Sequence, residues 1–585
     1  MSTTAIPAEL DATSWATIEP YFTELEERPV ECAAAMEQWL LDRSELDAAC
    51  SESRAKLYIN MTCDTADADA AAAYAAFVEN VEPQLDRASF RLDARQVTLA
   101  ETHRLTGDRY TVLHRNTAAE VGLFRDENVP LKTELSRLDQ RYDTVMGAMT
   151  VDFKGETRTL PQMAAFQEAT DRGTREQAWR AVADRRVQDR EAIDAIYDEQ
   201  IALRDRVAKN AGFDSFVGYA FESMHRFDYT PADCRDFHDA VETVLMPFCE
   251  QLQTRRASEL GLDVAELKPW DLSVDPRGRE PLTPFRGGAD LVAKSRRVFE
   301  SLDPELHAML ARLGDGANTA GNQTGALLDL DSRPGKAPGG YQYMLDRTRL
   351  PFIFMNAAGL HRDVETMVHE AGHAFHSMLC IDEPLVSYRH SPIEFAEVAS
   401  MSMELLSMPH WGCEGGFYED AAALVRAQRK QLEGSLSTLP WIATIDAFQH
   451  WIYEHPAHSR AERTEAWNGL MERFGLRGYR VAWDSSTEIA RDTAWQGQGH
   501  LFGVPFYYIE YGIAQLGALQ LWTKSRREGE QAAIEAYKRA LTLGGSQPLP
   551  ELFGAADIEF RFTADVLETT RAEVERALEE LPESD

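Results

Sequence analysis

The sequence has no long hydrophobic run. Its 585 residues contain no stretch of ~18 consecutive apolar residues, the length at which a segment becomes a candidate transmembrane helix. The N-terminal stretch MSTTAIPAELDATSW also lacks the basic start and the apolar core of a secretory signal peptide. We therefore expect a protein with no membrane partner and no export signal.

Cysteine is scarce, and its spacing follows no pattern. The seven cysteines are odd in number and no two of them form a CxxC pair, which excludes the usual signature of a redox motif or a cysteine-rich zinc site. They are Cys32, Cys50, Cys63, Cys234, Cys249, Cys380 and Cys413. A scattered, odd set is typical of free thiols in a reducing compartment, so we predict a cytoplasmic protein.

Positive charge is also in short supply. Lysine and arginine number 60 against 96 aspartate and glutamate residues, which gives a formal net charge of −36. A surface of this sign repels phosphate backbones and anionic lipids, so nucleic acid is not expected as a partner. The length exceeds that of one ordinary domain and predicts two or more lobes with a large core.

Most of the remaining sequence is typical of α-helix. Residues 68–85 are rich in alanine, and residues 173–212 show a long helical periodicity that ends at Gly212. We predict a mainly α fold on this pattern.

Two short β regions interrupt the helices. In residues 144–161, β-branched residues flank Lys154-Gly155, a dipeptide that favours a hairpin turn. Residues 340–346 and 350–356 predict two short strands joined by a turn, and they precede the stretch ETMVHEAGHAFHSMLC of residues 365–380.

That stretch contains the motif HExxH. On an α-helix, His369 and His373 lie one turn apart on the same face, about 6 Å from each other, so both imidazoles can bind one tetrahedral zinc ion. Glu370 lies beside the first ligand, where it can take a proton from a metal-activated water. His376 lies near the same face, but three histidine ligands on one helix are sterically awkward and the longer HExxHxxGxxH pattern is absent. We interpret His376 as a structural residue or a support to the ligands.

A third ligand is expected on the next helical segment, SPIEFAEVASMSMELLSM. Glu394, Glu397 and Glu404 share one face of this segment, which is otherwise strongly apolar. Carboxylates are costly to bury in such a helix unless a cation or a histidine compensates them. Spacing alone does not choose among the three glutamates.

These segments resemble the thimet oligopeptidase and oligoendopeptidase F family of zinc metallopeptidases. The His-bearing stretch resembles the family's HExGHxxHS core, and FAEVASMSMELL resembles its FxAExAS segment. The stretches RYDTVMGAMTVDFKGETRTLPQM, KPWDL and RPGKAPGGY are closest to the oligoendopeptidase F branch. The resemblance implies one zinc ion held by His369, His373 and Glu397, with Glu404 supporting a ligand histidine.

The resemblance extends to a downstream segment, GQGHLFGVPFYYIEYGIAQLGALQLW. It implies that His500, Tyr508 and Tyr511 close over the scissile carbonyl, where a donor aimed at the oxyanion supplies a few kcal/mol. The Tyr-x-x-Tyr spacing matches Tyr508 and Tyr511, whereas the interval from His500 to Tyr511 differs by about one residue from the family pattern. The alternative is an aromatic core stripe on a helix.

A glycine-rich loop, PGKAPGGYQY, is a candidate for substrate binding through Gly339, Gly340 and Tyr341. Its glycines would let the backbone approach a peptide closely. A simple turn before the strand is the alternative.

The resemblance also implies an architecture. It is a two-lobed, mainly helical, zincin-like fold with a small β-sheet beside the HExxH helix and a deep substrate channel. We predict an N-terminal helical lobe over residues 1–205, with a β-hairpin near 145–160, and a catalytic lobe over residues 206–585.

The implied function is that of a zinc-dependent endopeptidase acting on short unstructured peptides. A dipeptidyl carboxypeptidase or carboxypeptidase of the same fold is the alternative enzyme, and it would need a cation such as Arg347, Arg349 or Arg362 to hold the substrate's terminal carboxylate. A non-catalytic zinc- or peptide-binding homologue and a helical scaffold with a chance HExxH are the alternatives from other classes.

Overall fold

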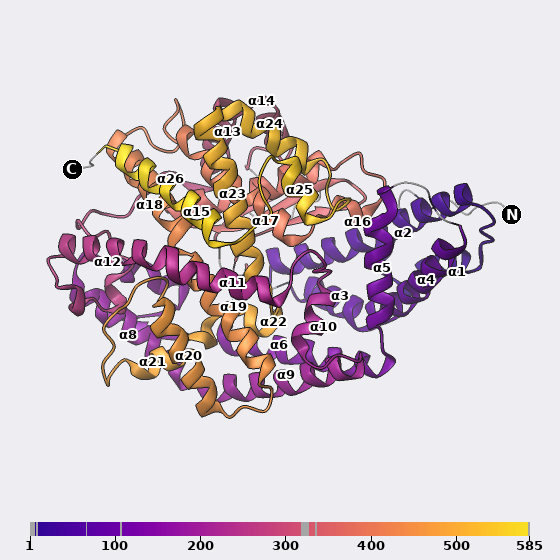
Figure 1. Cartoon of the computed structure of the whole chain (residues 1–585), viewed down its shortest axis with the longest axis horizontal. Helices are drawn as coiled ribbons and strands as arrows, with labels where there is room; N and C mark the ends of the chain where they lie inside the picture. Colours follow the sequence, from indigo (N-terminus) through magenta and orange to yellow (C-terminus); the bar gives the residue numbers. More distant parts are fainter. Residues whose placement is uncertain are drawn as a thin grey trace.

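The structure is a computed structural model that describes residues 6–7, 10–65, 67–103, 105, 108–316, 327–333, 336–337 and 339–582. Helices dominate the described chain, and α1 and α26 lie toward opposite ends of its long axis (Figure 1). No helix among these residues combines the length and the apolar character needed to cross a membrane.

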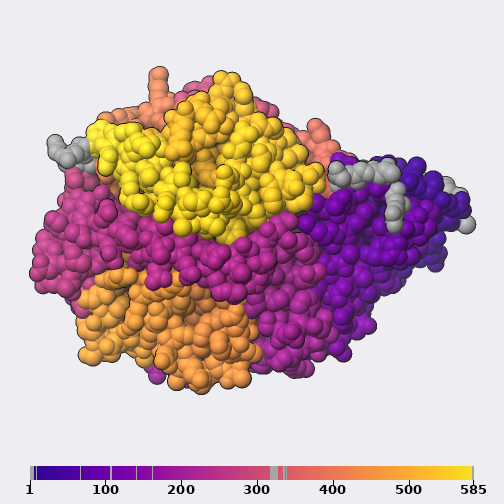
Figure 2. All heavy atoms as spheres, in the orientation of Figure 1, coloured from indigo at the N-terminus to yellow at the C-terminus, as the bar shows by residue number. Residues whose placement is uncertain are grey.

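The N-terminal helices pack around an apolar core of their own. Their bounds are α1 (Trp15–Glu27), α2 (Ala33–Cys63), α3 (Ala68–Asn80), α4 (Glu82–Thr102) and α5 (Thr111–Leu123). Phe22, Trp39 and Phe77 are buried in this core, and the helices form one end of the molecule (Figure 2). The alanine-rich segment 68–85 is helical, as expected, but it spans two helices. It breaks at Val81, because Pro83 lacks an N–H and fits the first turn of the new helix α4.

The predicted hairpin is confirmed. After α6 (Val129–Gly147), strands β1 (Thr150–Phe153) and β2 (Glu156–Thr159) pair antiparallel. Lys154 and Gly155 both have positive φ, at 51° and 83°, as a two-residue turn of this hand requires.

The long helix predicted over 173–212 is in fact two helices. After α7 (Ala164–Gln167), α8 (Arg172–Gln188) ends at Asp189, which leaves the helical conformation with ψ near 4°, and α9 (Arg190–Asn210) follows directly. The apolar periodicity continues through this one-residue break, so the pattern did not reveal it. The predicted lobe boundary at 205/206 falls inside α9 and remains a prediction.

A three-stranded sheet lies beside the HExxH helix, as predicted. The order is β3-β5-β4, with β5 parallel to β3 and antiparallel to β4. The strands are β3 (Leu328–Asp331), β4 (Tyr341–Leu345) and β5 (Leu350–Ala357). The two strands predicted at 340–346 and 350–356 are β4 and β5, while the four-residue β3 was not predicted. β4 is an edge strand.

The remaining helices complete the larger core, which extends from Leu123 to Leu578. Before the sheet they are α10 (Phe216–Ser223), α11 (Pro231–Ala240), α12 (Met246–Leu260), α13 (Gly287–Leu302) and α14 (Pro304–Ala311). After it they are α15 (His361–Leu379), α16 (Val386–Arg389), α17 (Ile393–Leu406), α18 (Ala421–Ser437), α19 (Leu439–Glu454), α20 (Arg460–Phe474), α21 (Glu488–Asp492), α22 (His500–Gly503), α23 (Tyr508–Glu528), α24 (Glu530–Leu541), α25 (Leu549–Ala555) and α26 (Ala564–Glu580).

Close packing of α15 on α17 depends on one glycine. A Cβ atom at Gly372 would lie 2.5 Å from the carbonyl oxygen of Ala399 and 2.6 Å from the Cα of Ser400. Both are backbone atoms, so no side chain could move aside. The two helices that carry the predicted ligands therefore touch backbone to backbone at this position.

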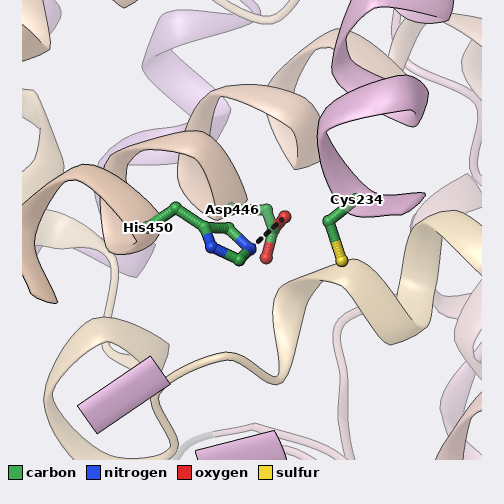
Figure 3. Close-up of side chains that lie close together, drawn as sticks. All are labelled: Cys234, Asp446 and His450. Carbon is green, nitrogen blue, oxygen red and sulfur yellow. Dashed lines mark ion pairs between the residues drawn. The ribbon is translucent and has the colours of Figure 1, made fainter. Parts of the chain in front are cut away.

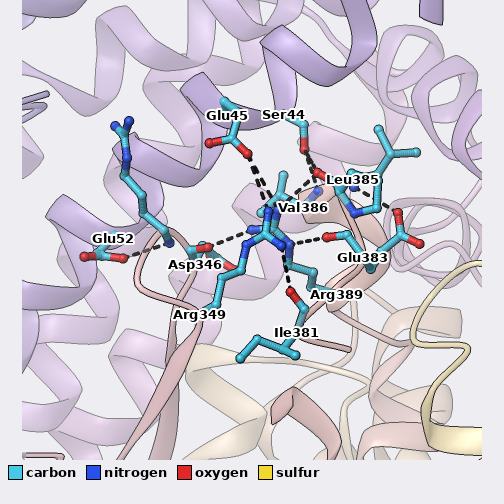
Figure 4. A network of polar contacts seen from close by, with 12 residues as sticks. Ser44, Glu45, Glu52, Asp346, Arg349, Ile381, Glu383, Leu385, Val386 and Arg389 are labelled. Carbon is cyan, nitrogen blue, oxygen red and sulfur yellow. Dashed lines mark hydrogen bonds and ion pairs between the residues drawn. The ribbon is translucent and has the colours of Figure 1, made fainter. Parts of the chain in front are cut away.

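A polar network joins the N-terminal helices to the chain between α15 and α17 (Figure 4). The buried guanidinium of Arg389 donates to the carbonyl of Asp346 at 2.7 Å. Ser44 on α2 donates to the carbonyl of Pro384 at 3.0 Å and accepts from the backbone N–H of Val386 at 2.6 Å. These bonds fix the N-terminal helices against the frame of the ligand-bearing pair.

Candidate metal centre

Three side chains from α15 and α17 converge on one point. The Nε2 atoms of His369 and His373 lie 3.3 Å and 3.6 Å from Oε2 of Glu397. All three donor atoms lie within 4.8 Å of one another. Two imidazoles and a carboxylate at this spacing are the ligand set of a zincin-type site, so the residues present fit a single metal ion.

Glu404 orients the first of these ligands. Nδ1 of His369 donates to Oε1 of Glu404 at 2.8 Å, and Oε2 of Glu404 accepts from Gln431 on α18 at 2.9 Å. With the proton fixed on Nδ1, the lone pair of Nε2 points toward the converging donors. A carboxylate behind a ligand histidine is the usual arrangement in metal sites.

The surroundings set the protonation state of each ligand. Burial alone would lower the pKa of His369, but its hydrogen bonds to Glu397 and Glu404 raise that pKa well above its ordinary value, so a metal ion displaces a proton from this ligand. Burial alone would raise the pKa of Glu397, but His373 and His369 outweigh it and lower that pKa to about 2. Burial lowers the pKa of His373 to about 4. At neutral pH Glu397 is therefore an anion and His373 a neutral imidazole, which are the protonation states that a metal requires.

Glu370 lies beside the triad as a poised base. Its side chain is 6% exposed, and burial raises its pKa to about 7. Its Oε2 has no hydrogen-bond partner among the described residues. A Cβ atom at Gly340 would lie 3.8 Å from its Oε1, so the glycine predicted for substrate binding leaves open space next to this carboxylate.

A tyrosine that sequence reasoning missed contacts the triad directly. The hydroxyl of Tyr507 donates to Oε1 of Glu397 at 3.1 Å. Its ring lies 5.1 Å from the ring of Tyr511, one turn along α23, and 5.7 Å from that of His500. The Tyr-x-x-Tyr match selected Tyr508 instead. The one-turn spacing of Tyr507 and Tyr511, which puts both on one helix face, was the signal that could have identified it.

The predicted tyrosines and histidine have different partners: Tyr511 packs beside Tyr507, whereas Tyr508 and His500 contact Gln498. Burial and the nearby Glu397 raise the pKa of Tyr511, whose ring packs against that of Tyr507. The hydroxyl of Tyr508 instead donates to Oε1 of Gln498 at 3.3 Å. Nδ1 of His500 lies 2.8 Å from Nε2 of the same glutamine, so Gln498 links Tyr508 to His500.

Two other candidates lie close in sequence but outside the triad. His376 is buried against Phe395, with ring centroids 6.1 Å apart, and burial lowers its pKa to about 3. Glu394 accepts from the hydroxyl of Tyr229 at 2.8 Å and lies 3.8 Å from the guanidinium of Arg226. The structure gives these two residues partners other than the converging donors.

The glycine-rich loop is described only in part, because Pro334, Gly335 and Pro338 lie outside the described residues. The carbonyl of Gly339 accepts from Asn356 at 2.9 Å. The hydroxyl of Tyr341 bonds Oγ1 of Thr62 at 2.6 Å, so its side chain faces α2. Within this loop, Gly340 is the residue that lies next to the base Glu370.

The arginines considered for binding a substrate carboxylate have other contacts. Arg347 donates to the carbonyl of Pro7, and Arg349 donates to the carbonyl of Ile381 at 2.7 Å. Arg362 lies 3.9 Å from Asp363 and is half exposed. The first two belong to the junction with the N-terminal helices.

A model of peptidase family M3 matches residues 165–572 of this sequence. The chain belongs to this family. Peptidases of family M3 are metallopeptidases, so membership implies a metal. The mainly helical fold is confirmed as well, because solved structures of similar proteins superpose over the whole chain. The structure of PZ peptidase A with an inhibitor has a TM-score of 0.87 at 25% identity and covers 100% of both chains.

Further relatives carry the oligoendopeptidase F name. A crystal structure of a candidate oligoendopeptidase F has a TM-score of 0.87 at 26% identity and covers 99% of both chains. The oligoendopeptidase F homolog of Borreliella burgdorferi is 26% identical over 209 residues, which is 34% of this chain and 33% of that relative. The chain thus spans about a third of the length of that curated family M3 relative.

Proposed function

We propose that this protein is a zinc-dependent endopeptidase that hydrolyses internal bonds of short, unstructured peptides in the cytoplasm. The observation that carries the proposal is the convergence of His369, His373 and Glu397 beside the buried base Glu370. Membership of family M3 supports it. The cytoplasmic assignment is supported by the seven cysteines, all described and all free.

His369, His373 and Glu397 would hold the zinc ion. When bound, the ion supplies a Lewis acid that polarises the scissile carbonyl and lowers the pKa of water. The unbonded Oε2 of Glu370 takes the proton of the attacking water and passes it to the leaving amine. A base with a pKa near 7 suits both transfers.

The tyrosines act next to the ligand Glu397. The hydroxyl of Tyr511 on α23 serves as a donor to the oxygen that becomes negative during attack, and the ring of Tyr507, just before α23, packs against the Tyr511 ring at 5.1 Å. Tyr507 also orients the ligand Glu397 through its 3.1 Å bond. His500 packs against both rings and supports this donor cluster.

The edge strand β4 supplies a template for the substrate backbone. An edge strand has unpaired N–H and C=O groups, to which an extended peptide can add as a further strand. Gly340, just before β4, has no side chain, so no side chain stands between the backbone and Glu370 at this position. This geometry favours recognition of the main chain along a peptide over capture of its terminus.

The test pairs two glutamine substitutions on the same helix. Glu370→Gln should keep its zinc and lose nearly all turnover, whereas Glu365→Gln, whose carboxylate contacts His361, should stay close to wild type. Turnover is measured on internally quenched peptides and zinc by elemental analysis. Wild-type activity in Glu370→Gln would refute the assignment of the base.

Peptides with an amidated C-terminus separate the endopeptidase from the carboxypeptidase alternatives. An enzyme that needs a free terminal carboxylate cannot cleave them, because its cation has no partner. We expect internal cleavage of such peptides, identified by mass spectrometry. Products released only from free C-termini, two residues at a time, would establish the dipeptidyl alternative instead.

A further inference from the structure

A second cluster of metal-ligating side chains is buried between α11 and α19, outside the HExxH site. Cys234 and His238 lie one turn apart on α11, and Asp446 and His450 lie one turn apart on α19. Their exposed fractions are 0%, 3%, 0% and 4%. Figure 3 shows the thiol of Cys234 projecting from one helix toward the carboxylate and imidazole of the other.

The donor atoms of this cluster lie at ligand spacing. Those of Cys234, Asp446 and His450 lie within 4.8 Å of one another. Nε2 of His450 is 3.5 Å from Oδ2 of Asp446, which also bonds Nε2 of His238 at 2.8 Å. Two helices thus bring a sulfur, an oxygen and a nitrogen donor to one buried point.

Several of these atoms lack a protein partner. Oδ1 of Asp446 and both ring nitrogens of His450 are buried without a hydrogen bond to any described residue. Buried polar atoms in native proteins nearly always have a hydrogen-bond partner, and a bound ion is one of the explanations when no protein group supplies it. The aromatic rings of Phe506 and Phe221 pack around His450, at 5.2 Å and 6.2 Å, and offer no donor.

Arg226, a buried cation that acts on Cys234, already has acidic partners elsewhere. Arg226 donates to Oε1 of Glu510 at 2.8 Å and lies 3.8 Å from Glu394. A divalent cation would balance one thiolate and one carboxylate.

We propose that Cys234, Asp446 and His450 hold a second metal ion, a zinc that ties α11 to α19. Thiolate and imidazole donors favour zinc over magnesium or calcium, which prefer oxygen ligands. His238 is a positioning residue, because its bond to Oδ2 of Asp446 leaves Oδ1 available to the ion.

The ion would fix α19, which contacts the segment that precedes Tyr507 and Tyr511. Gln449, next to His450, accepts the backbone N–H of Phe506, and Tyr507 follows directly in the chain. A fixed α19 therefore fixes the segment that enters α23. The inference does not depend on peptidase activity. Cys234, Asp446 and His450 contact neither Glu370 nor the three ligands of the HExxH site.

Cobalt distinguishes the two sites, because only the α11–α19 site contains sulfur. The full chain is produced in cobalt-supplemented medium, so that a buried site is filled during folding. We expect two cobalt ions per wild-type chain and a thiolate-to-cobalt charge-transfer band. Cys234→Ser should lose one ion and the whole band, while Cys249→Ser, a matched change at another buried cysteine of the same core, should keep both.

The double variant His369→Ala/His373→Ala is the reciprocal arm. It should keep the full charge-transfer band whether or not the proposed peptidase function is correct, and it should lose one ion if His369 and His373 bind the catalytic metal. X-ray absorption on the wild-type zinc protein needs no variant and should show a sulfur neighbour at about 2.3 Å. The absence of both the band and the sulfur neighbour in the wild-type protein would overturn the proposal, and so would a band that survives Cys234→Ser.

Discussion

Replacing Gly372 by alanine tests whether the contact of α15 with α17 builds the metal centre. The new methyl carbon would lie 2.5 Å from the oxygen of Ala399 and 2.6 Å from the Cα of Ser400. Ordinary carbon contacts are about 3.5–4.0 Å, so the helices must separate by about 1 Å at this point. Because α17 carries Glu397 and α15 carries both histidines, that displacement passes directly to the ligand set.

The magnitudes follow from this displacement. Overpacking of a close contact costs about 1–3 kcal/mol of folding stability. A 1 Å misplacement of catalytic geometry costs about 100-fold in rate, and ligand sets tolerate only about 0.5 Å. We expect Gly372→Ala to unfold at a lower temperature, to bind zinc more weakly and to retain about 1% of wild-type kcat/KM.

The assay compares three quantities in two variants. Zinc affinity by chelator competition, thermal unfolding and kcat/KM are measured for Gly372→Ala and for Gly469→Ala. Gly469 lies within α20 and a Cβ atom there meets nothing within 4 Å, so alanine should leave stability unchanged or raise it by about 0.5–1 kcal/mol. Wild-type zinc affinity and activity in Gly372→Ala would refute the argument.

Three further predictions concern the base, the orienting carboxylate and the tyrosines. Glu370 acts as a base only when it is ionised, and a bound cation lowers its pKa from about 7. We therefore expect kcat/KM to rise with pH along an acidic limb that ends at or below pH 7. An acidic limb centred above pH 7 would contradict this role. Glu404→Ala should weaken zinc binding about 10–100-fold in a chelator titration, because His369 loses its orienting partner; unchanged affinity would exclude that role. Tyr507→Phe should lower kcat/KM more than Tyr508→Phe does, and the reverse order would restore the sequence-based choice.

The parts of the site that the sequence predicted are those encoded by local spacing. His369 and His373 lie one turn apart in any α-helix, and Glu370 is their immediate neighbour, so their proximity requires only that the helix forms. The hairpin at Lys154-Gly155 is local in the same sense, because its turn conformation is set by two adjacent residues.

The parts that were missed depend on contacts between distant segments. Tyr507 and Tyr508 are adjacent in sequence, and only the packing of α23 decides that the first hydroxyl reaches Glu397 while the second reaches Gln498. Helix spacing alone also left the third ligand open, although the family resemblance implied Glu397. Glu394 and Glu397 lie on one face of α17, but Arg226 and Tyr229 occupy the surroundings of Glu394.

The two metal-ligating clusters follow one construction rule. In each, a helix supplies two donors one turn apart, His369 and His373 on α15 or Asp446 and His450 on α19, and a second helix supplies the third. The first pair is recognisable in sequence because the intervening Glu370 makes it a known motif. The second pair has no such neighbour, and its partner Cys234 lies more than 200 residues away, so only the fold brings the donors together. A one-turn pair of donors on a helix becomes a candidate site when a second helix delivers a buried third donor to the same point.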